Sequence, residues 1–491
     1  MAICDESHDI RSGMLQIWPE RLHRFFWLRD LRTMGGQEAR QCAKDMVMQW
    51  ITHYGGRPKT QEQHLAWRTD ILGERISNWI AHYDFIDSCH TQHDETFHDA
   101  FFGSLYNQTQ QLARRIPSGL HDLSLLKALK GLLYAGLAFE GQEALIEKSL
   151  ALLKPEIEKQ FLADGMHISR SPMQLLRGLQ ILLDIKSTLN IGGYPLPLFI
   201  QHGIDRAGPA LKFFRFGDKR LATFHSTQKG CPALVDSILA QAGVRGKAHT
   251  SLSCAGFERV NLGRSVLMFD GGSPPKAPYD RLSHAAPLSF EMAYGKDRVF
   301  VSCGTHPTQT NWSDSLRATA AHNAVCLDHR NAYDIRDNGH FARKAQSVHY
   351  KRAGEERDGS VLLEGHHDGY LPLNGVMHSR SLYLGEKGHD LRGEDKLCAK
   401  ITPLKPIDIA IRFHLHPRVL VSLVQDGTHA LIRLPSGIGW RFQNSAGLLT
   451  LEDSIYLGEG CEPRKTKQLV IFGQTTEKQS SIKWSFQREG L

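Results

Sequence analysis

The hydrophobic pattern of this chain changes its period near residue 245, and that change limits the possible folds more than any other feature. Before it, apolar residues recur every three or four positions, as on the buried face of a helix. After it, apolar and polar residues alternate in short runs separated by Gly, Asp and Asn, which is typical of antiparallel strands. The expected helices are Met14–Leu31, Cys42–Ile51, Ile71–Phe85, Phe97–Arg114, Leu123–Phe139, Gln142–Phe161, Pro172–Leu189 and Cys231–Ala242. The expected strands of the second half include Val419–Val424, Ala430–Leu434, Gly439–Phe442, Leu448–Leu451, Lys467–Phe472 and Ile482–Phe486.

These patterns predict an α+β multidomain protein, with a helical domain over residues 1–245 and an antiparallel β-sandwich over residues 246–491. A length of 491 residues is also too great for a single core. Short connections between the helices favour hairpins stacked into a bundle, a solenoid or a ring. No repeat of fixed length selects among these three.

Composition places few limits on function. The net charge of +7, from 59 Lys and Arg against 52 Asp and Glu, favours an acidic partner such as a polyanionic glycan. No nucleic-acid-binding motif accompanies this charge, so nucleic acid is not the expected partner. Nine cysteines scattered without a C-x-x-C pair argue against a disulfide framework and a structural zinc module.

Sequence signals for membranes and export are missing. No run of about 18 apolar residues is present, so no membrane span is expected. The first residues are acidic and lack the apolar core of a secretory signal. The expectation is therefore either a cytoplasmic protein or a start that lies inside a longer reading frame.

The stretch from residue 281 to residue 328 carries the strongest indication of a functional site. Three strand-like segments, Leu288–Ala293, Arg298–Cys303 and Asn323–Leu327, are joined by polar loops, and three histidines lie at or beside their ends. A rigid sheet often holds such side chains over a cleft. Neutral imidazole is a common metal ligand and general base, so a shared site of His284, His306 and His322 is one hypothesis. The alternative is that they are hydrogen-bonded histidines inside the sandwich.

Three short motifs in this stretch lie in a recognisable order. They read His284-Ala-Ala-Pro-Leu-Ser289-Phe290, then Val301-Ser302-Cys303-Gly304-Thr305, then Arg317-Ala-Thr319-Ala-Ala-His322-Asn323. The stretch resembles the C-terminal domain of the heparinase II/III-like family, polysaccharide lyases that cleave acidic glycans by β-elimination. The resemblance implies an incomplete (α/α) toroid followed by an antiparallel β-sandwich, with the active site between them. It also implies an acidic polysaccharide as the partner.

The resemblance further implies a metal held by two His and an Asp, and here this sequence departs from the family. His284 and His322 match the two imidazole ligands, but Ser302 stands where the Asp is expected. Leu282 stands where another family histidine lies. Zinc usually takes more protein ligands than two imidazoles, so both a zinc site and a metal-free site remain open.

The helical half departs further from the family's catalytic set. Gln174 stands where the family has a Tyr, and Leu123 and Ser124 align with its Asn-His pair. An amide cannot donate a proton to a leaving oxygen as a phenol can.

The remaining candidates are His306, His167, Arg170 and Arg317 as catalytic groups, with Asn323 and Gln174 as substrate-binding groups. Either arginine has the geometry to grip a carboxylate through two hydrogen bonds.

Two functions follow from these observations. The first is a polysaccharide lyase-like enzyme that acts on a uronate-containing glycan by β-elimination. The second is a catalytically silent glycan-binding or cell-envelope protein on the same scaffold. The resemblance implies the cell envelope or periplasm, whereas the N-terminal sequence favours the cytoplasm, and the sequence gives no oligomeric state.

Overall fold

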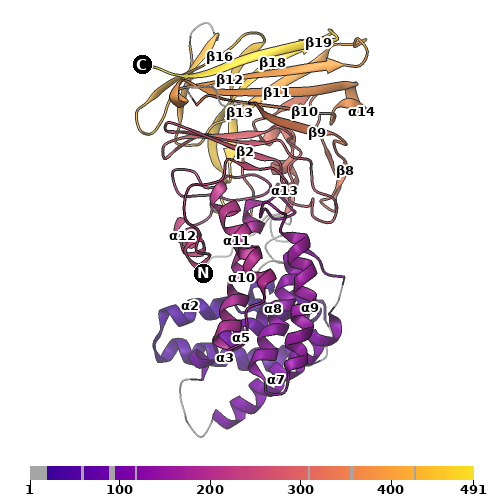
Figure 1. Cartoon of the computed structure of the whole chain (residues 1–491), viewed down its shortest axis with the longest axis vertical. Coiled ribbons are helices and arrows are strands. Elements are labelled where there is room, and N and C mark those ends of the chain that lie inside the picture. Colours follow the sequence, from indigo (N-terminus) through magenta and orange to yellow (C-terminus); the bar gives the residue numbers. More distant parts are fainter. Residues whose placement is uncertain are drawn as a thin grey trace, which may run out of the picture. The chain divides into compact units, whose positions relative to one another are not determined.

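The computed structural model (Figure 1) describes residues 19–56, 60–87, 94–116, 119–307, 310–353, 359–424 and 427–490. The chain divides into two compact units. The first unit contains the described residues up to Gln160 together with Arg177–Ile204, and the second contains Phe161–Leu176 and the chain from Asp205 onward. Residues 161–176 and 205–245 therefore pack with the strands, although the sequence pattern groups them with the helices.

Helices predominate in the described part of the chain before residue 246, as predicted. The described helices are α2 (Trp27–Met34), α3 (Gly36–Tyr54), α4 (Gln61–Ala66), α5 (Thr69–Ala81), α6 (Tyr83–Ile86), α7 (Asp94–Arg115), α8 (Asp122–Ala138), α9 (Glu143–Gln160), α10 (Pro172–Ile191), α11 (Leu198–Phe213) and α12 (Pro232–Gln241). The sequence pattern did not predict α11, because Pro209 and two glycines interrupt its apolar face. The first part of the expected helix Met14–Leu31 lies outside the described residues. No helix in the described ranges is both long enough and apolar enough to cross a bilayer.

Close packing of α5 against α8 forms the centre of the first unit. Ten residues of α5 are buried, including Ile71, Ile76 and Trp79. The two helices approach through glycines, since a Cβ added at Gly131 would lie 2.3 Å from the carbonyl oxygen of Gly73. Neither position tolerates a side chain without displacing the facing backbone.

Antiparallel strands build the second unit, which confirms the predicted β-sandwich. Its five-stranded sheet contains β1 (Ser251–Leu252), β2 (Phe257–Leu262), β3 (Ser265–Asp270), β4 (Phe290–Tyr294) and β5 (Asp297–Phe300). The eight-stranded sheet runs in the order β14 (Leu420–Leu423), β15 (His429–Arg433), β16 (Gly439–Asn444), β19 (Gln479–Arg488), β12 (Asp390–Ala399), β11 (Val376–Gly385), β10 (Val361–His367) and β9 (Val348–Ala353). The four-stranded sheet contains β17 (Leu448–Tyr456), β18 (Arg464–Thr475), β13 (Ile407–His414) and β6 (Val325–Leu327). The short elements are β7 (Asp334–Ile335), β8 (Phe341–Arg343), α13 (Thr310–Arg317) and α14 (Leu371–Asn374).

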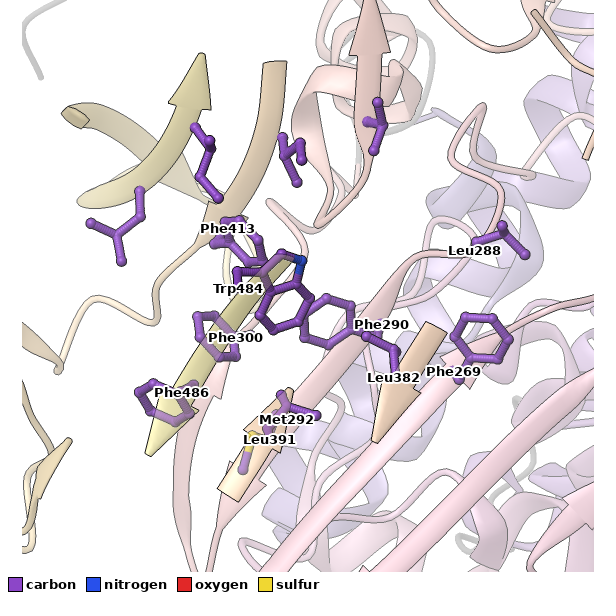
Figure 2. Close-up of a cluster of buried hydrophobic side chains, with 14 of the residues drawn as sticks. Phe269, Leu288, Phe290, Met292, Phe300, Leu382, Leu391, Phe413, Trp484 and Phe486 are labelled. Carbon is purple, nitrogen blue, oxygen red and sulfur yellow. The ribbon is translucent and has the colours of Figure 1, made fainter. Parts of the chain in front are cut away.

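Aromatic side chains from all three large sheets meet in the core of the sandwich (Figure 2). The Trp484 ring stacks on Phe290 with centroids 5.6 Å apart, and Phe413 meets it edge-on at 4.8 Å. Because side chains alternate along a strand, burial of Trp484 and Phe486 turns Lys483 and Ser485 to the opposite face of β19. At β19 the sheet thus turns an apolar face to the core and a polar face away from it.

Candidate functional site

The segment Thr223–Lys229 lies beside several of the predicted site residues, although the sequence pattern did not single it out. His225 and Ser226 both have positive φ, 47° and 53° respectively. Two consecutive non-glycine residues in the left-handed region are unusual and need surrounding contacts to hold them. Further along, the amide of Gln228 donates to the Thr305 carbonyl at 3.0 Å. The segment thereby joins the loop after β5 to the rest of the site.

Three imidazoles pack in a row at the centre of this region. The His284 and His322 rings stack with centroids 4.0 Å apart and planes 23° apart, and the His225 ring lies 5.3 Å from that of His284. The backbone N–H of Ser226 donates to Nε2 of His284 at 2.7 Å. In return, the backbone N–H of His284 donates to Nδ1 of His225 at 3.1 Å. We call His225, His284 and His322 the histidine triplet.

A buried carboxylate fixes the orientation of one end of the triplet. Nε2 of His225 lies 2.9 Å from Oδ2 of Asp270, the last residue of β3, and the guanidinium of Arg170 pairs with Oδ1 of the same carboxylate. Burial alone would raise the pKa of Asp270, but the charge of Arg170 and the contact with His225 hold that pKa below its usual value. Asp270 is therefore ionised and holds the proton of His225 on Nε2.

All three rings of the triplet are neutral at neutral pH. Burial lowers the pKa of His225, and it lowers the pKa of His284 and His322 to well below their ordinary value. The neighbouring imidazoles reinforce this effect for His284. The three side chains are at most 3% exposed. The triplet is thus a closed, uncharged group in the interior.

The residues around His322 connect the triplet to the sandwich. The Ser302 hydroxyl lies 2.8 Å from Nδ1 of His322, in the place where the family resemblance leads one to expect an Asp. The amide of Asn323 donates to the Phe290 carbonyl at 2.7 Å and accepts from the backbone N–H of His414 at 2.7 Å. Asn323 therefore links the loop before β6 to β4 and β13, and its predicted contact with substrate stays a prediction.

A second buried network holds the two loops that carry His284 and His322. Arg380 donates to the backbone carbonyls of Leu288 at 3.0 Å and Asn323 at 2.6 Å. Its Nε pairs with Asp395 at 2.7 Å, and Nε2 of His378 lies 2.8 Å from the same carboxylate. Burial opposes ionisation of Asp395, but Arg380 and His378 hold its pKa well below the usual range. Arg380 thus anchors both loops from within the core.

Each guanidinium nitrogen of Arg317 donates to a backbone carbonyl near the loop before His284, and Nη1 also lies 3.6 Å from Oδ1 of Asp314. Nε donates to the Ser283 carbonyl at 2.8 Å, and the two terminal nitrogens donate to Gly339 at 2.8 Å and Asp280 at 3.1 Å. The side chain is 2% exposed. These contacts favour a structural role, whereas the predicted catalytic role stays a prediction.

Arg170 is held in a similar way. Its guanidinium donates to the carbonyls of Ala255 at 2.7 Å and Gly272 at 3.3 Å, in addition to the ion pair with Asp270. The guanidinium also covers the Phe257 ring at 4.6 Å. Each nitrogen already has a partner and the side chain is 5% exposed, so little of the guanidinium of Arg170 is accessible to a substrate carboxylate.

The other two predicted catalytic histidines differ in exposure. His167 is fully buried, and its Nδ1 lies 2.8 Å from the Ser169 hydroxyl. His306, in the loop after β5, is 8% exposed, and burial lowers its pKa although a backbone contact at Cys461 opposes this shift. His306 is therefore a neutral imidazole at neutral pH, the form required of a general base.

The departures from the family in the helical half are visible in the structure. Gln174 is half-buried near the start of α10, beside Met173, whose backbone N–H donates to the Thr227 hydroxyl at 3.1 Å. Leu123 is buried in α8 and Ser124 is half-buried. None of these three positions supplies an ionisable side chain.

The structure gives no complete ligand set for a metal. Within the described ranges, no group of three or more His, Cys, Asp or Glu residues is placed to hold an ion. His284 and His322 do lie together as predicted, but they stack face to face and Nε2 of His284 already accepts a hydrogen bond. Leu282 contributes only its carbonyl, which accepts from the Ser226 hydroxyl at 2.9 Å. This arrangement does not fit zinc, and the zinc ion stays a prediction to be tested by metal analysis.

One further cluster escaped the sequence analysis. Lys229 is 4% exposed, and its Nζ lies 3.2 Å from Nε2 of His416 and 3.6 Å from Glu459. Burial lowers the pKa of Lys229 to about 8, and burial together with Lys229 lowers the pKa of His416 to about 2. No spacing in the sequence joins these residues, which lie 187 positions apart.

Family models match both halves of the chain. The model described as heparinase II/III-like, C-terminal, matches residues 244–485, and the model described as heparinase II/III N-terminus matches residues 14–194. FtsZ-localized protein C of Caulobacter vibrioides is 29% identical over 487 residues, which cover 94% of this chain and 80% of that protein.

Solved structures resemble the fold along nearly the whole chain. The crystal structure of heparinase III has a TM-score of 0.78 at 13% identity, over 96% of this chain and 77% of that chain. A mutant of the heparan sulfate lyase HepC from Pedobacter heparinus has a TM-score of 0.70 at 16% identity, over 95% of this chain and 76% of that chain. The likeness shows the fold, a helical toroid followed by an antiparallel β-sandwich.

Proposed function

Because the chain belongs to the heparinase II/III-like family, we propose that it binds an acidic, uronate-containing polysaccharide and holds it without cleaving it. The fold and the net charge of +7 support an acidic glycan as the ligand. The contacts of the candidate catalytic residues support binding without cleavage.

Elimination at a uronide makes three demands on a protein. The carboxylate must be neutralised so that the neighbouring C–H becomes acidic. A base then takes that proton while a carbon–carbon double bond forms and the bond to the glycosidic oxygen breaks, and an acid protonates the departing oxygen. An arginine, a neutral imidazole and a phenol suit these tasks.

One observation carries the preference for binding: the groups suited to these tasks already have partners in the protein. Arg317 donates to three backbone carbonyls, and Arg170 donates to two carbonyls and to Asp270. The Nε2 atom of His284 accepts a backbone N–H. In place of the phenol stands Gln174, which is not a proton donor of comparable acidity.

A lyase activity is the second candidate, and His306 favours it. Its imidazole is more exposed than those of the triplet, and its lowered pKa keeps it neutral at neutral pH. In this alternative His306 takes the proton from the sugar carbon and then donates the same proton to the departing glycosidic oxygen. No second acid is needed. The matching test is loss of product in His306→Ala.

The experiment that separates the two candidates measures binding and product in one sample. The purified full chain is incubated with heparan, chondroitin, alginate and bacterial exopolysaccharides, with affinity electrophoresis for binding and ultraviolet absorbance for unsaturated uronide. Retention of at least one glycan without absorbance supports binding. Absorbance that grows with time for the wild type and is absent for His306→Ala overturns binding without cleavage in favour of elimination. If the protein retains none of the glycans, the proposed class of ligand is wrong.

The relative named FtsZ-localized protein C supports an envelope-associated role for this chain, with the cytoplasm as the alternative. We expect a fluorescent fusion of the full chain to gather where labelled FtsZ does. A diffuse signal throughout the cell would contradict this expectation.

A further inference from the structure

The outer face of the eight-stranded sheet is hollowed into an open groove of about 770 Å³. Its walls come from β10, β11, β12, β19 and β16, and from the start of β15. This face lies opposite the aromatic core that contains Trp484 and Phe486 (Figure 2). The groove is therefore separated from the core by the sheet itself.

Strand register places one continuous row of side chains across this groove. Partners in neighbouring strands link His429 to Gln443, Gln443 to Ser485, Ser485 to Arg392, Arg392 to Tyr383 and Tyr383 to Leu362. With strands about 4.8 Å apart, the row extends about 24 Å. Its length and openness suit an extended ligand better than a compact one.

Several side chains in the groove offer hydrogen-bonding groups that the protein does not use. Within the described ranges, the side chains of Gln443, Ser485, Tyr383 and Gln487 make no hydrogen bond to another protein group, and the ammonium of Lys483 has neither a hydrogen bond nor an ion pair. A set of donors and acceptors left open in a concavity is what a polyhydroxylated ligand requires.

The other charges in the groove are neutralised locally. Arg392 pairs with the buried carboxylate of Asp390 at 2.6 Å, and Glu394 pairs with Lys396 at 3.1 Å. Lys483 lies opposite Glu394 in the strand register but forms no ion pair with it, and it is the one Lys or Arg without an ion pair among the described groove residues. One cation outside an ion pair fits a ligand with sparse carboxylates, and it is too few for the dense phosphates of nucleic acid.

Apart from Trp484, which is buried in the core, Tyr383 is the one Phe, Tyr or Trp among the described groove residues. A Cβ added at Gly385 would lie 2.6 Å from the Tyr383 ring, so the ring lies over the backbone of its own strand two positions further on. A ring laid along the sheet presents a face on which a sugar can stack. Leu362 is the only aliphatic hydrophobic side chain among the groove residues described, so the groove lacks the apolar centre of a protein–protein interface.

From these features we infer that the groove binds an oligosaccharide segment of an acidic polysaccharide, with Lys483 on a sugar carboxylate and Tyr383 under a sugar ring. The inference rests on the proposed function for the class of ligand, and it locates that ligand on the outer sheet face, apart from the histidine triplet.

The test compares groove variants with a matched control in the full chain. Lys483→Ala and Tyr383→Ala remove the proposed contacts. Lys351→Ala removes the same charge from the same sheet face, where Lys351 pairs with Glu364 at 2.8 Å outside the groove. Binding of size-defined heparan sulfate, chondroitin and alginate oligosaccharides is measured by calorimetry, and circular dichroism melting checks folding.

We expect each groove variant to bind about tenfold more weakly, the usual loss for one charged hydrogen bond or one stacked ring. Lys351→Ala should bind as the wild type does. Lys351→Ala and Lys483→Ala should have the melting temperature of the wild type, since both lysines are exposed, whereas Tyr383 is half-buried and its variant is checked by melting. If either groove variant melts early, Gly385→Ala serves as the independent variant, because its Cβ displaces the Tyr383 ring and should weaken binding to a similar degree.

Each other outcome overturns a different statement. Wild-type affinity in both groove variants overturns the groove and leaves the proposed function standing. No binding by the wild type overturns both. A monomer–dimer equilibrium that shifts in Lys483→Ala, without a change in glycan affinity, makes the groove a subunit interface and overturns the inference.

Discussion

Replacing Arg317 by alanine separates a structural role from a catalytic one. The guanidinium donates to carbonyls at 2.8, 2.8 and 3.1 Å and lies 5.5 Å from the Phe341 ring. A hydrogen bond to a charged group contributes about 1.5–3 kcal/mol to stability, and bonds that share one donor group are not additive. We expect Arg317→Ala to lower the free energy of unfolding by about 3–5 kcal/mol.

At roughly 2 °C per kcal/mol in a domain of this size, the melting temperature should fall by about 6–10 °C. Differential scanning calorimetry on the full chain measures this shift. Arg433→Ala is the control, because Arg433 is exposed on β15. Arg317→Lys should recover only part of the loss, since an ammonium reaches fewer of the three carbonyls. A variant that melts within about 2 °C of the wild type but no longer binds or cleaves glycan would refute the structural role.

Three other perturbations test separate parts of the account. Burial lowers the pKa of His414 to about 4 in the folded protein. As the pH falls below about 6.5, this histidine therefore becomes protonated in the unfolded chain while it stays neutral in the folded one. The free energy of unfolding should consequently fall by about 1.4 kcal/mol per pH unit down to about pH 4. Urea unfolding at a series of pH values should show a shallower slope in His414→Gln, and equal slopes would contradict the buried neutral state. In the first unit, Gly131→Ala should destabilise the protein by about 1–3 kcal/mol, because the new Cβ would clash with the facing helix α5. The control Gly103→Ala, which has open space around it, should stabilise the protein by roughly 0.5–1 kcal/mol. Equal effects of the two substitutions would refute the close helix contact. Finally, if His284 and His322 hold a zinc ion, elemental analysis should find stoichiometric zinc and chelation should lower the melting temperature. Purified protein without zinc would refute the zinc site.

Periodicity predicted the architecture because it reports which face of an element is buried. The strands near the C-terminus, β14 to β19, formed at the expected segments. By contrast, α11 was missed, because Pro209 lies inside it and breaks the pattern without breaking the helix. Apolar periodicity identifies an element only where the buried face is uninterrupted.

The candidate site was predicted only in part, for a physical reason. His284 and His322 were expected to lie together, and their rings stack. His225 and Asp270 were not expected there, because tertiary packing brings them to the site from segments without a motif. The sequence also cannot show that backbone carbonyls occupy Arg170 and Arg317, since those acceptors exist only once the loops have folded.

The most direct test of the central claim is native mass spectrometry of the purified full chain mixed with uronate-containing oligosaccharides of defined length. The account predicts complexes whose ligand mass stays constant over prolonged incubation. Shorter, unsaturated oligosaccharides that accumulate with time would contradict it, as would the absence of any complex.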